Sequence, residues 1–421
     1  MKTKDITKQN QNLYIAQAAI EYLLSILVTG SFLATITSSI GVPDSITGII
    51  SSIISLGCSF QLFSLFIHTK KSKGFVIVTS IINQILFLSL YLIPILNISQ
   101  QLKTILFVVI IVAAYFIYNV AHPKKINWLM SNVDENRRGI FTANKEIVSL
   151  VAGMAFSYGA GAISDYFAAK GDINTAFIIF AALSVALTIV HTVTMLPITT
   201  EKEVSARKIN IGVTLRVLFS NKNIVKVVIL FTLYYIIKDI AAPFYGVYLI
   251  KDLNFKLTTI TILGMVSSLS RIAVSRYWGR YADRKGFAAM VEKCFIFYLV
   301  GNLFATFTNP ATGLVMYAGY CICHGIALGG INSAITNMVF YYVEPEHRAD
   351  SLAVSQAFSG IVGFITTIVF SYVVTAVQAS GNQVFGMTVY AQQILSAVAA
   401  IVTVIAILFV RFAIIRKTKA D

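Results

Sequence analysis

Long apolar runs alternate with short polar segments along the whole chain. Six runs carry no Asp, Glu, Lys or Arg: 46–67, 75–96, 173–196, 314–343, 351–377 and 384–410. Six more are shorter or hold a charge: 13–36, 104–120, 147–163, 227–250, 257–275 and 294–308. A span needs about 20 apolar residues, and in lipid a helix satisfies its own backbone groups. The pattern therefore predicts an all-α integral membrane protein with twelve transmembrane helices.

The composition agrees with this class. Of 421 residues, 57% are hydrophobic and 12% are charged, which is too little charge to cover the surface of a soluble domain. The sequence holds no H-E-x-x-H, G-x-S-x-G or phosphate-loop motif. The four cysteines lie in apolar runs, where we expect inert thiols. We expect no enzyme activity, no cofactor and no metal site.

The net charge of +15 reflects membrane topology and does not indicate a nucleic-acid partner. With the N-terminus inside, 27 of the 33 Lys and Arg residues fall on the cytoplasmic side, and the outer loops hold only Lys103, Lys170, Lys251 and Lys256. This is the positive-inside bias. We expect both termini in the cytoplasm, no removable signal peptide, a location in the cell membrane, and a monomer.

A polar segment at residues 199–223 divides the chain into two halves of six spans each. We predict an N-terminal bundle at 1–198, a cytoplasmic linker at 199–223 and a C-terminal bundle at 224–421. A weak internal repeat supports this division. Acidic residues with a trailing arginine occur at 133–138 and again at 343–348, an offset of 210 residues. Parallel repeats of this kind are known in transporters.

The most specific motif is the loop at 279–286, which reads G-R-Y-A-D-R-K-G. Together with twelve spans and a central linker, it resembles the signature loop G-x-x-x-D-R/K-x-G of the major facilitator superfamily. The resemblance implies two six-helix pseudo-symmetric bundles and a gating role for Gly279, Asp283, Arg284 and Gly286. Gly279 would allow a close helix approach, and Gly286 a tight turn. The alternative is a basic loop that only follows the topology rule.

The expected gating role of Asp283 follows from its charge. A carboxylate can accept hydrogen bonds at the N-terminus of a neighbouring helix. The resemblance makes span 5 the partner, and that span should begin near Arg138. We expect this cap in the outward-open state only. The equivalent loop between spans 2 and 3 has Lys71 where the acid belongs, so the inner gate should depend on one anchor.

Four charged residues interrupt apolar spans: Glu21, Lys238, Asp239 and Arg271. A charge near the middle of a bilayer is costly, so such residues mark a solute path or a binding site. Glu21 and Asp239 are the carboxylates best suited to take up a coupling proton in a low-dielectric site.

The resemblance also implies a central cavity lined by spans 1, 4, 7 and 10. The candidate substrate-binding residues on these spans are Glu21, Tyr115, Asn119, Lys238, Asp239, Tyr245 and His324. Pro243 in span 7, and Gly325, Gly329 and Gly330 in span 10, should interrupt or loosen these helices for gating.

Structural roles are the alternatives for several of these residues. Lys238 and Asp239 could form an ion pair with other helices, and Glu21 could extend to the membrane interface. His324 could be a core histidine with satisfied hydrogen bonds. Arg271 could pair with Glu146 or Glu21.

Taken together, the residues and the resemblance predict a secondary active transporter. We expect it to move a small polar or amphiphilic solute by alternating access, coupled to protons through Glu21 and Asp239. The alternative is a multidrug efflux antiporter of the same superfamily.

Overall fold

The computed structural model describes residues 2–67, 72–133, 138–199, 222–342, 348–384 and 386–415. Within these ranges, eleven helices are long and apolar enough to cross a membrane. A twelfth long helix, α9 (Lys222–Val247), has 26 residues and carries Lys238 and Asp239. At about 1.5 Å per residue it is long enough for a bilayer core of about 30 Å. The predicted all-α fold with twelve transmembrane helices is confirmed.

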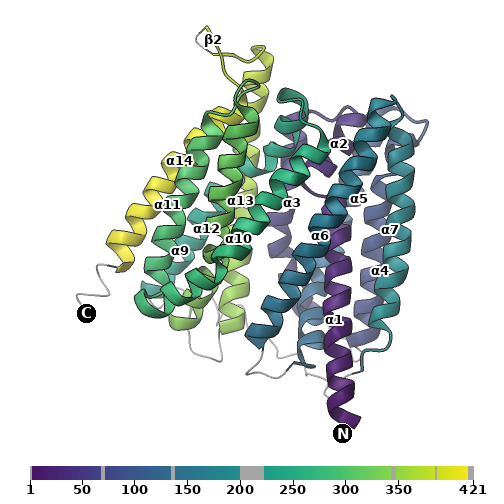
Figure 1. Cartoon of the computed structure of the whole chain (residues 1–421), viewed down its shortest axis with the longest axis vertical. Helices are drawn as coiled ribbons and strands as arrows, with labels where there is room; N and C mark the ends of the chain where they lie inside the picture. Colours follow the sequence, from purple (N-terminus) through teal and green to yellow (C-terminus); the bar gives the residue numbers. More distant parts are fainter. Residues whose placement is uncertain are drawn as a thin grey trace. The chain divides into compact units, whose positions relative to one another are not determined.

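The first compact unit contains Met1–Pro43, Phe60–Lys208 and Lys256–Thr261. Its helices are α1 (Lys2–Leu27), α2 (Gly30–Ser39), α4 (Ser72–Leu90), α5 (Gln100–Met130), α6 (Arg138–Ala169) and α7 (Ile173–Met195), with 3₁₀ turns η1 (Gln61–Phe66) and η2 (Ile93–Ile95). Helix α1 packs against α6 and α7, and α4 packs against α5 and α7 (Figure 1). These contacts bring polar residues of α1, α4, α5 and α7 together in the interior of this unit.

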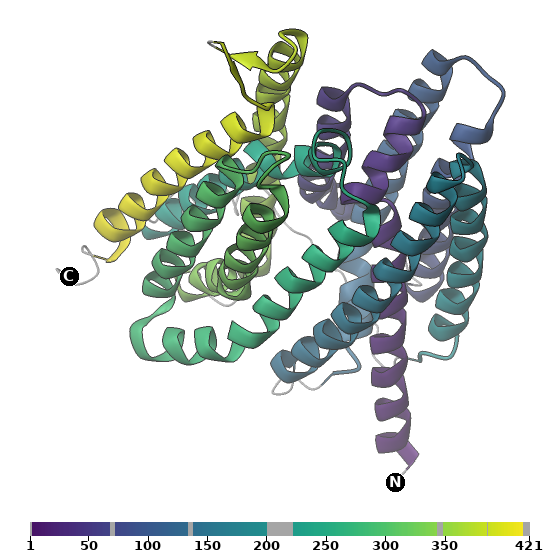
Figure 2. The same ribbon diagram turned by 45° about the horizontal axis from the view of Figure 1, so that its top comes forward.

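The second compact unit contains Asp44–Ser59, Ile209–Phe255 and Ile262–Asp421. Its elements are α3 (Asp44–Phe60), α9, the π-helix η4 (Tyr248–Asp252), α10 (Leu257–Lys285), α11 (Phe287–Thr306), α12 (Gly313–Tyr342), α13 (Arg348–Ala379), α14 (Ala391–Phe409) and the π-helix η6 (Val410–Ile415). Helix α14 runs beside α11 (Figure 2), and α9 packs against α12, α13 and α14. Helix α9 is therefore buried along most of its length.

A short antiparallel hairpin in the connection from α13 to α14 is a local exception to the helical pattern. Strand β1 (Gln383–Val384) pairs with β2 (Met387–Thr388), with Gln383 opposite Thr388 and Val384 opposite Met387. Two-residue strands give too little periodicity to be recognised in a sequence.

The compact units differ from the predicted halves at two places. Asp44–Ser59, from the first half of the chain, belongs to the second unit, and Lys256–Thr261, from the second half, belongs to the first. The first half therefore contributes nearly all of α3 to the second unit, and the second half contributes the start of α10 to the first unit. Most of the predicted linker at 199–223 lies outside the described residues, as do residues 134–137 and 343–347 of the internal repeat.

Helices α6 and α13 follow the internal repeat. They begin at Arg138 and Arg348, the offset of 210 residues seen in the sequence, and each has 32 residues. The resemblance between the halves thus extends from a short motif to the start and length of a whole helix.

The first predicted span is broken, which the apolar pattern did not indicate. Helix α1 ends at Leu27, and α2 begins at Gly30, whose φ of +54° is accessible to glycine at low cost. The break leaves helix carbonyls without their usual partners. The Tyr91 hydroxyl donates a hydrogen bond to the carbonyl of Leu27, so a side chain satisfies the backbone where lipid could not.

Pro243 weakens α9 at one hydrogen bond without ending the helix. Proline has no N–H, so the carbonyl four residues earlier, at Asp239, loses its helical donor. The Thr367 hydroxyl of α13 donates to that carbonyl at 2.8 Å. The helix then continues through Val247 into η4.

The expectation that glycines loosen span 10 is wrong. Helix α12 runs without interruption from Gly313 to Tyr342. A Cβ atom added at Gly325 would lie 2.2 Å from the carbonyl oxygen of Ser267, and one at Gly330 would lie 2.6 Å from Cys294 Sγ. These glycines are needed because α10 and α11 pack closely against α12, as small residues allow in membrane proteins.

We predict that Thr367→Val lowers the free energy of unfolding by about 1 kcal/mol, because the Asp239 carbonyl would lose the hydroxyl that replaces its helical donor. Thr366→Val is the matched control. The Thr366 hydroxyl donates to Val362 of its own helix at 2.8 Å, and that carbonyl keeps the N–H of Thr366 as a possible donor. Unfolding in mixed micelles measures both variants. Equal losses would mean that Thr367 has no special role at the proline.

Candidate functional site

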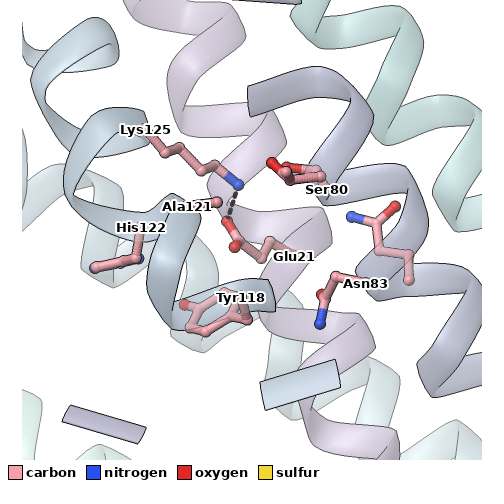
Figure 3. Close-up of a pocket in the computed structure, with 9 residues that line it drawn as sticks. Glu21, Ser80, Asn83, Tyr118, Ala121, His122 and Lys125 are labelled. Carbon is pink, nitrogen blue, oxygen red and sulfur yellow. Dashed lines mark hydrogen bonds and ion pairs between the residues drawn. The ribbon is translucent and has the colours of Figure 1, made fainter. Parts of the chain in front are cut away.

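Two polar clusters hold the predicted charged residues, one in each compact unit. In the first unit, Glu21 of α1 faces α4 and α5 (Figure 3). Lys125 Nζ lies 2.7 Å from Glu21 Oε2, and Lys125 is only 4% exposed. At this distance a charge-assisted hydrogen bond offsets part of the cost of removing both charges from water. The ion pair is the charged centre of the first cluster.

A small polar pocket surrounds this ion pair. Its other lining residues come from α4 and α5: Thr79, Ser80, Asn83, Gln84, Tyr118, Ala121 and His122 (Figure 3). The cavity volume is about 10 Å³, roughly the space for one water molecule. In this conformation the pocket can hold a water molecule or a proton, and it is too small for a solute.

Lys125 was missed by the sequence analysis, which counted it with the cytoplasmic lysines. That assignment is corrected by its burial and by its bond to Glu21. Helix α5 continues through Pro123 to Met130, so Lys125 stays inside the unit. A signal was present in the sequence. Asn119, His122 and Lys125 recur every three residues, which places polar side chains on one side of a helix.

A buried histidine extends the first cluster to α7, and the sequence analysis did not single it out. His191 is fully buried. Its Nδ1 lies 3.0 Å from the Gln84 amide nitrogen, and its Nε2 lies 3.0 Å from Gln17 Oε1. With Gln84 donating, the imidazole is neutral and donates through Nε2 to Gln17. Gln17 lies one turn before Glu21 on α1, so His191 supports the helix that carries the carboxylate.

Tyr115 and Asn119 lie on α5 but are not among the residues that line the Glu21 pocket. The Asn119 amide donates to the Tyr115 carbonyl at 2.8 Å and accepts from Gln61 at 3.4 Å. The Tyr115 ring packs edge-on against Phe87, with centroids 5.3 Å apart. Both predicted site residues are buried and make local contacts in this conformation.

The second cluster is centred on the adjacent residues Lys238 and Asp239 of α9. Lys238 Nζ lies 3.5 Å from Asp239 Oδ1, donates to Ser55 Oγ of α3 at 3.0 Å, and lies 4.6 Å from the centre of the Tyr235 ring. Asp239 is 2% exposed, and within the described ranges its Oδ2 has no hydrogen-bond partner. A Cβ atom at Gly363 would lie 2.2 Å from that oxygen. The glycine thus allows α13 to pack directly on the carboxylate.

Tyr245 and His324 belong to a group of aromatic rings in contact with one another on α9, α11 and α12. The Tyr320 ring lies 4.9 Å from that of Tyr245 and stacks on His324 at 5.0 Å. Tyr298 meets His324 edge-on, also at 5.0 Å. The two predicted site residues Tyr245 and His324 are therefore joined through the ring of Tyr320.

The predicted gating motif lies at the junction of α10 and α11. Asp283 and Arg284 are exposed in the last turn of α10. Gly286 has φ of +85° and precedes α11, as a tight turn between helices requires. A Cβ atom at Gly279 would meet no described atom within 4 Å, so the expected close approach is not present there. Lys71 lies outside the described residues.

These features define a class of protein. Long membrane-crossing helices enclose charges in small polar clusters, and the described residues contain no group of His, Cys, Asp or Glu arranged to hold a metal ion. The sequence profile of the Major Facilitator Superfamily matches residues 14–367 and 227–420. The chain belongs to this superfamily, and it is a membrane transporter and not an enzyme.

Several solved structures have the same fold at low sequence identity. The nucleoside transporter NupG is 15% identical with a TM-score of 0.71, and the match covers 96% of this chain and 98% of NupG. A bacterial homologue of the iron transporter ferroportin, in an inward-facing state, is 11% identical with a TM-score of 0.66, covering 96% and 98%. A bacterial homologue of the human lysosomal transporter Spinster is 11% identical with a TM-score of 0.65, covering 97% and 96%. No curated protein matches the sequence.

We predict that Glu21→Gln lowers the free energy of unfolding by about 3 kcal/mol, because it leaves Lys125 buried without its counter-charge. Adding Lys125→Met should recover part of the loss, since the double variant has no unpaired charge. Glu292→Gln is the control. Its partner Arg411, at 2.8 Å, has a side chain 54% exposed, so about 1 kcal/mol or less is expected. A double variant as unstable as the sum of both single variants would contradict the pairing.

Proposed function

We propose that the protein moves a small polar or amphiphilic solute across the membrane by alternating access, coupled to a proton carried by Asp239. Membership of the superfamily supports transport, and charges buried in both compact units support coupling. The observation that carries the proposal is the buried Asp239 oxygen, Oδ2, which has no hydrogen-bond partner among the described residues.

Asp239 can accept a proton without losing an existing hydrogen bond at Oδ2. A carboxylate oxygen without a donor is costly in a low-dielectric site. The neighbouring Lys238 side chain is 29% exposed, so its ammonium can turn away from Asp239 towards water or solute. A proton on Asp239 would then neutralise the buried carboxylate that Lys238 has left without a counter-charge. When Lys238 returns to the carboxylate, the proton leaves.

Glu21, the other carboxylate expected to carry a proton, has a different environment. Its Oε2 accepts a hydrogen bond from Lys125 at 2.7 Å. We propose that this ion pair stays charged during the cycle and keeps the pocket of the first unit hydrated. Between the two predicted proton carriers, this assigns coupling to Asp239 and a supporting role to Glu21.

The proposed solute-binding residues are the other candidates: Tyr115, Asn119, Lys238, Asp239, Tyr245 and His324. Their rings can stack on a planar solute, and their amide, hydroxyl and charged groups can bind hydroxyls or polar substituents. A nucleoside carries both a planar ring and hydroxyl groups. Because one structural neighbour is a nucleoside transporter, nucleosides are the first solutes to test.

The remaining parts of the proposal concern membrane placement and gating. We propose that the protein lies in the cell membrane. The excess of Lys and Arg on one side supports a cytoplasmic location for both termini. We propose a monomer whose halves, 1–198 and 224–421, move about the linker at 199–223. The loop with Gly279, Asp283, Arg284 and Gly286 is proposed to stabilise the closed inner side.

We predict that one class of polar solute raises the midpoint of thermal unfolding, because a ligand stabilises the state it binds. A library beginning with nucleosides, sugars and amino acids would be screened on the purified protein. A hit would then be added outside proteoliposomes loaded with the pH dye pyranine, where coupled transport changes the internal pH. Equal competition by unrelated amphiphiles would favour the multidrug antiporter. Solute uptake without any proton flux would contradict coupling.

We predict that Asp239→Asn abolishes solute accumulation driven by a pH gradient but leaves solute exchange between the two sides. An amide cannot take up or release the coupling proton, whereas binding and alternation need only the shape of the site. Glu21→Gln, measured in the same proteoliposomes and corrected for protein amount, should retain pH-driven accumulation. The opposite pair of results would assign the coupling proton to Glu21.

A further inference from the structure

An acidic side chain of α6 binds the start of α10. Asp165 accepts hydrogen bonds from the backbone N–H groups of Leu257 at 2.8 Å and Thr258 at 2.9 Å, and from the Thr258 hydroxyl at 2.6 Å. One turn earlier, a Cβ atom at Gly161 would lie 3.2 Å from the Thr258 nitrogen. Helix starts carry unpaired N–H groups and partial positive charge. Asp165, Leu257 and Thr258 are called the Asp165 clasp below.

A second acidic contact involves the start of α3. Asp44, the first residue of α3, accepts from Lys251 Nζ of η4 at 2.5 Å and from the Gln378 amide of α13 at 2.6 Å. The Asp44 side chain is 13% exposed. One carboxylate thus connects a helix start, a π-helix and the end of a long helix. Asp44, Lys251 and Gln378 are called the Asp44 clasp.

The two clasps occupy equivalent positions in the duplicated halves. Asp44 and Leu257 are both the first residues of their helices, and they are 213 residues apart. Asp165 and Gln378 both lie near the ends of the 32-residue helices α6 and α13, and they are also 213 residues apart. Each clasp therefore joins the end of one repeated helix, α6 or α13, to the start of the other repeated helix, α10 or α3. The acid lies at the helix end in the Asp165 clasp and at the helix start in the Asp44 clasp.

The clasps also bind the two segments that depart from the predicted halves. The Asp165 clasp holds residues of Lys256–Thr261, which belong to the first unit, and the Asp44 clasp holds the start of Asp44–Ser59, which belongs to the second. We propose that these clasps form a paired outer gate, made in the present conformation and broken in the alternate one. On release, each segment would leave its present unit and move with its own half. This inference rests on the proposed alternating-access cycle.

We predict that Asp165→Asn reduces the ratio of clasped to released molecules about tenfold, the effect of losing a hydrogen bond to a charged group. Spin labels at Ile178→Cys on α7 and Leu269→Cys on α10, both exposed positions, would report the two populations as two distances. The measurement uses the full chain in lipid nanodiscs without solute, with the four native cysteines replaced by alanine.

The matched control is Asp172→Asn, which changes an acid that caps its own helix, α7. Asp172 accepts from the Thr175 N–H at 3.3 Å and from its hydroxyl at 2.6 Å. The Asp172→Asn substitution should leave the distances between the spin labels unchanged. If Asp165→Asn also leaves them unchanged, or if both variants act equally, the clasp is only a helix cap and the gate inference fails. A distance change in a protein that moves no solute would overturn the proposed transport and keep the gate.

Hydrogen exchange provides a measurement that keeps the native cysteines. The amides of Leu257 and Thr258 should exchange about tenfold faster in Asp165→Asn than in the parent, and at the parent rate in Asp172→Asn. Equal protection in all three proteins would overturn the role of Asp165.

Discussion

A polar group inside a membrane must find its partner within the protein, and most features of this structure follow from that constraint. The carboxylate of Glu21 meets the ammonium of Lys125. Backbone groups obey the same rule. Where the first span breaks, the Tyr91 hydroxyl binds the carbonyl of Leu27, and where Pro243 removes a donor, Thr367 supplies one. These partners come from helices far away in the sequence. Each one satisfies a polar group of another helix and, by the same contact, holds the two helices together.

Close packing is the second consequence, because lipid gives little hydrophobic drive for helix association. Glycine recurs where a backbone or a carboxylate comes near. Gly363 admits Asp239, Gly325 admits the Ser267 carbonyl, and Gly161 lies against the start of α10. The glycine at 363 has a direct bearing on chemistry. It allows α13 to cover the Asp239 oxygen, which removes water from the group proposed to carry the proton.

The proposed site and the proposed gate share one element. Helix α9 carries Lys238 and Asp239 and continues into η4, where Lys251 binds Asp44. A continuous helix moves largely as one body. Release of Lys251 from Asp44 and rearrangement at Lys238 and Asp239 would therefore move the same segment. Asp283, near the end of α10, was expected to cap the start of a distant helix. A cap of this kind is present at the start of α10, where Asp165 of α6 accepts a hydrogen bond from the Leu257 N–H.

The sequence alone determined the all-α membrane fold, because lipid requires long apolar helices and their pattern is visible residue by residue. It also identified Glu21, Lys238 and Asp239, since a charge in an apolar run stands out. The partners were decided only by tertiary structure. Lys125 sits beside basic residues typical of a cytoplasmic loop, and its burial depends on how far α5 extends and how α1 packs on its neighbours. The clasps of Asp165 and Asp44 join residues 92 to 334 positions apart, and no local pattern records such a contact.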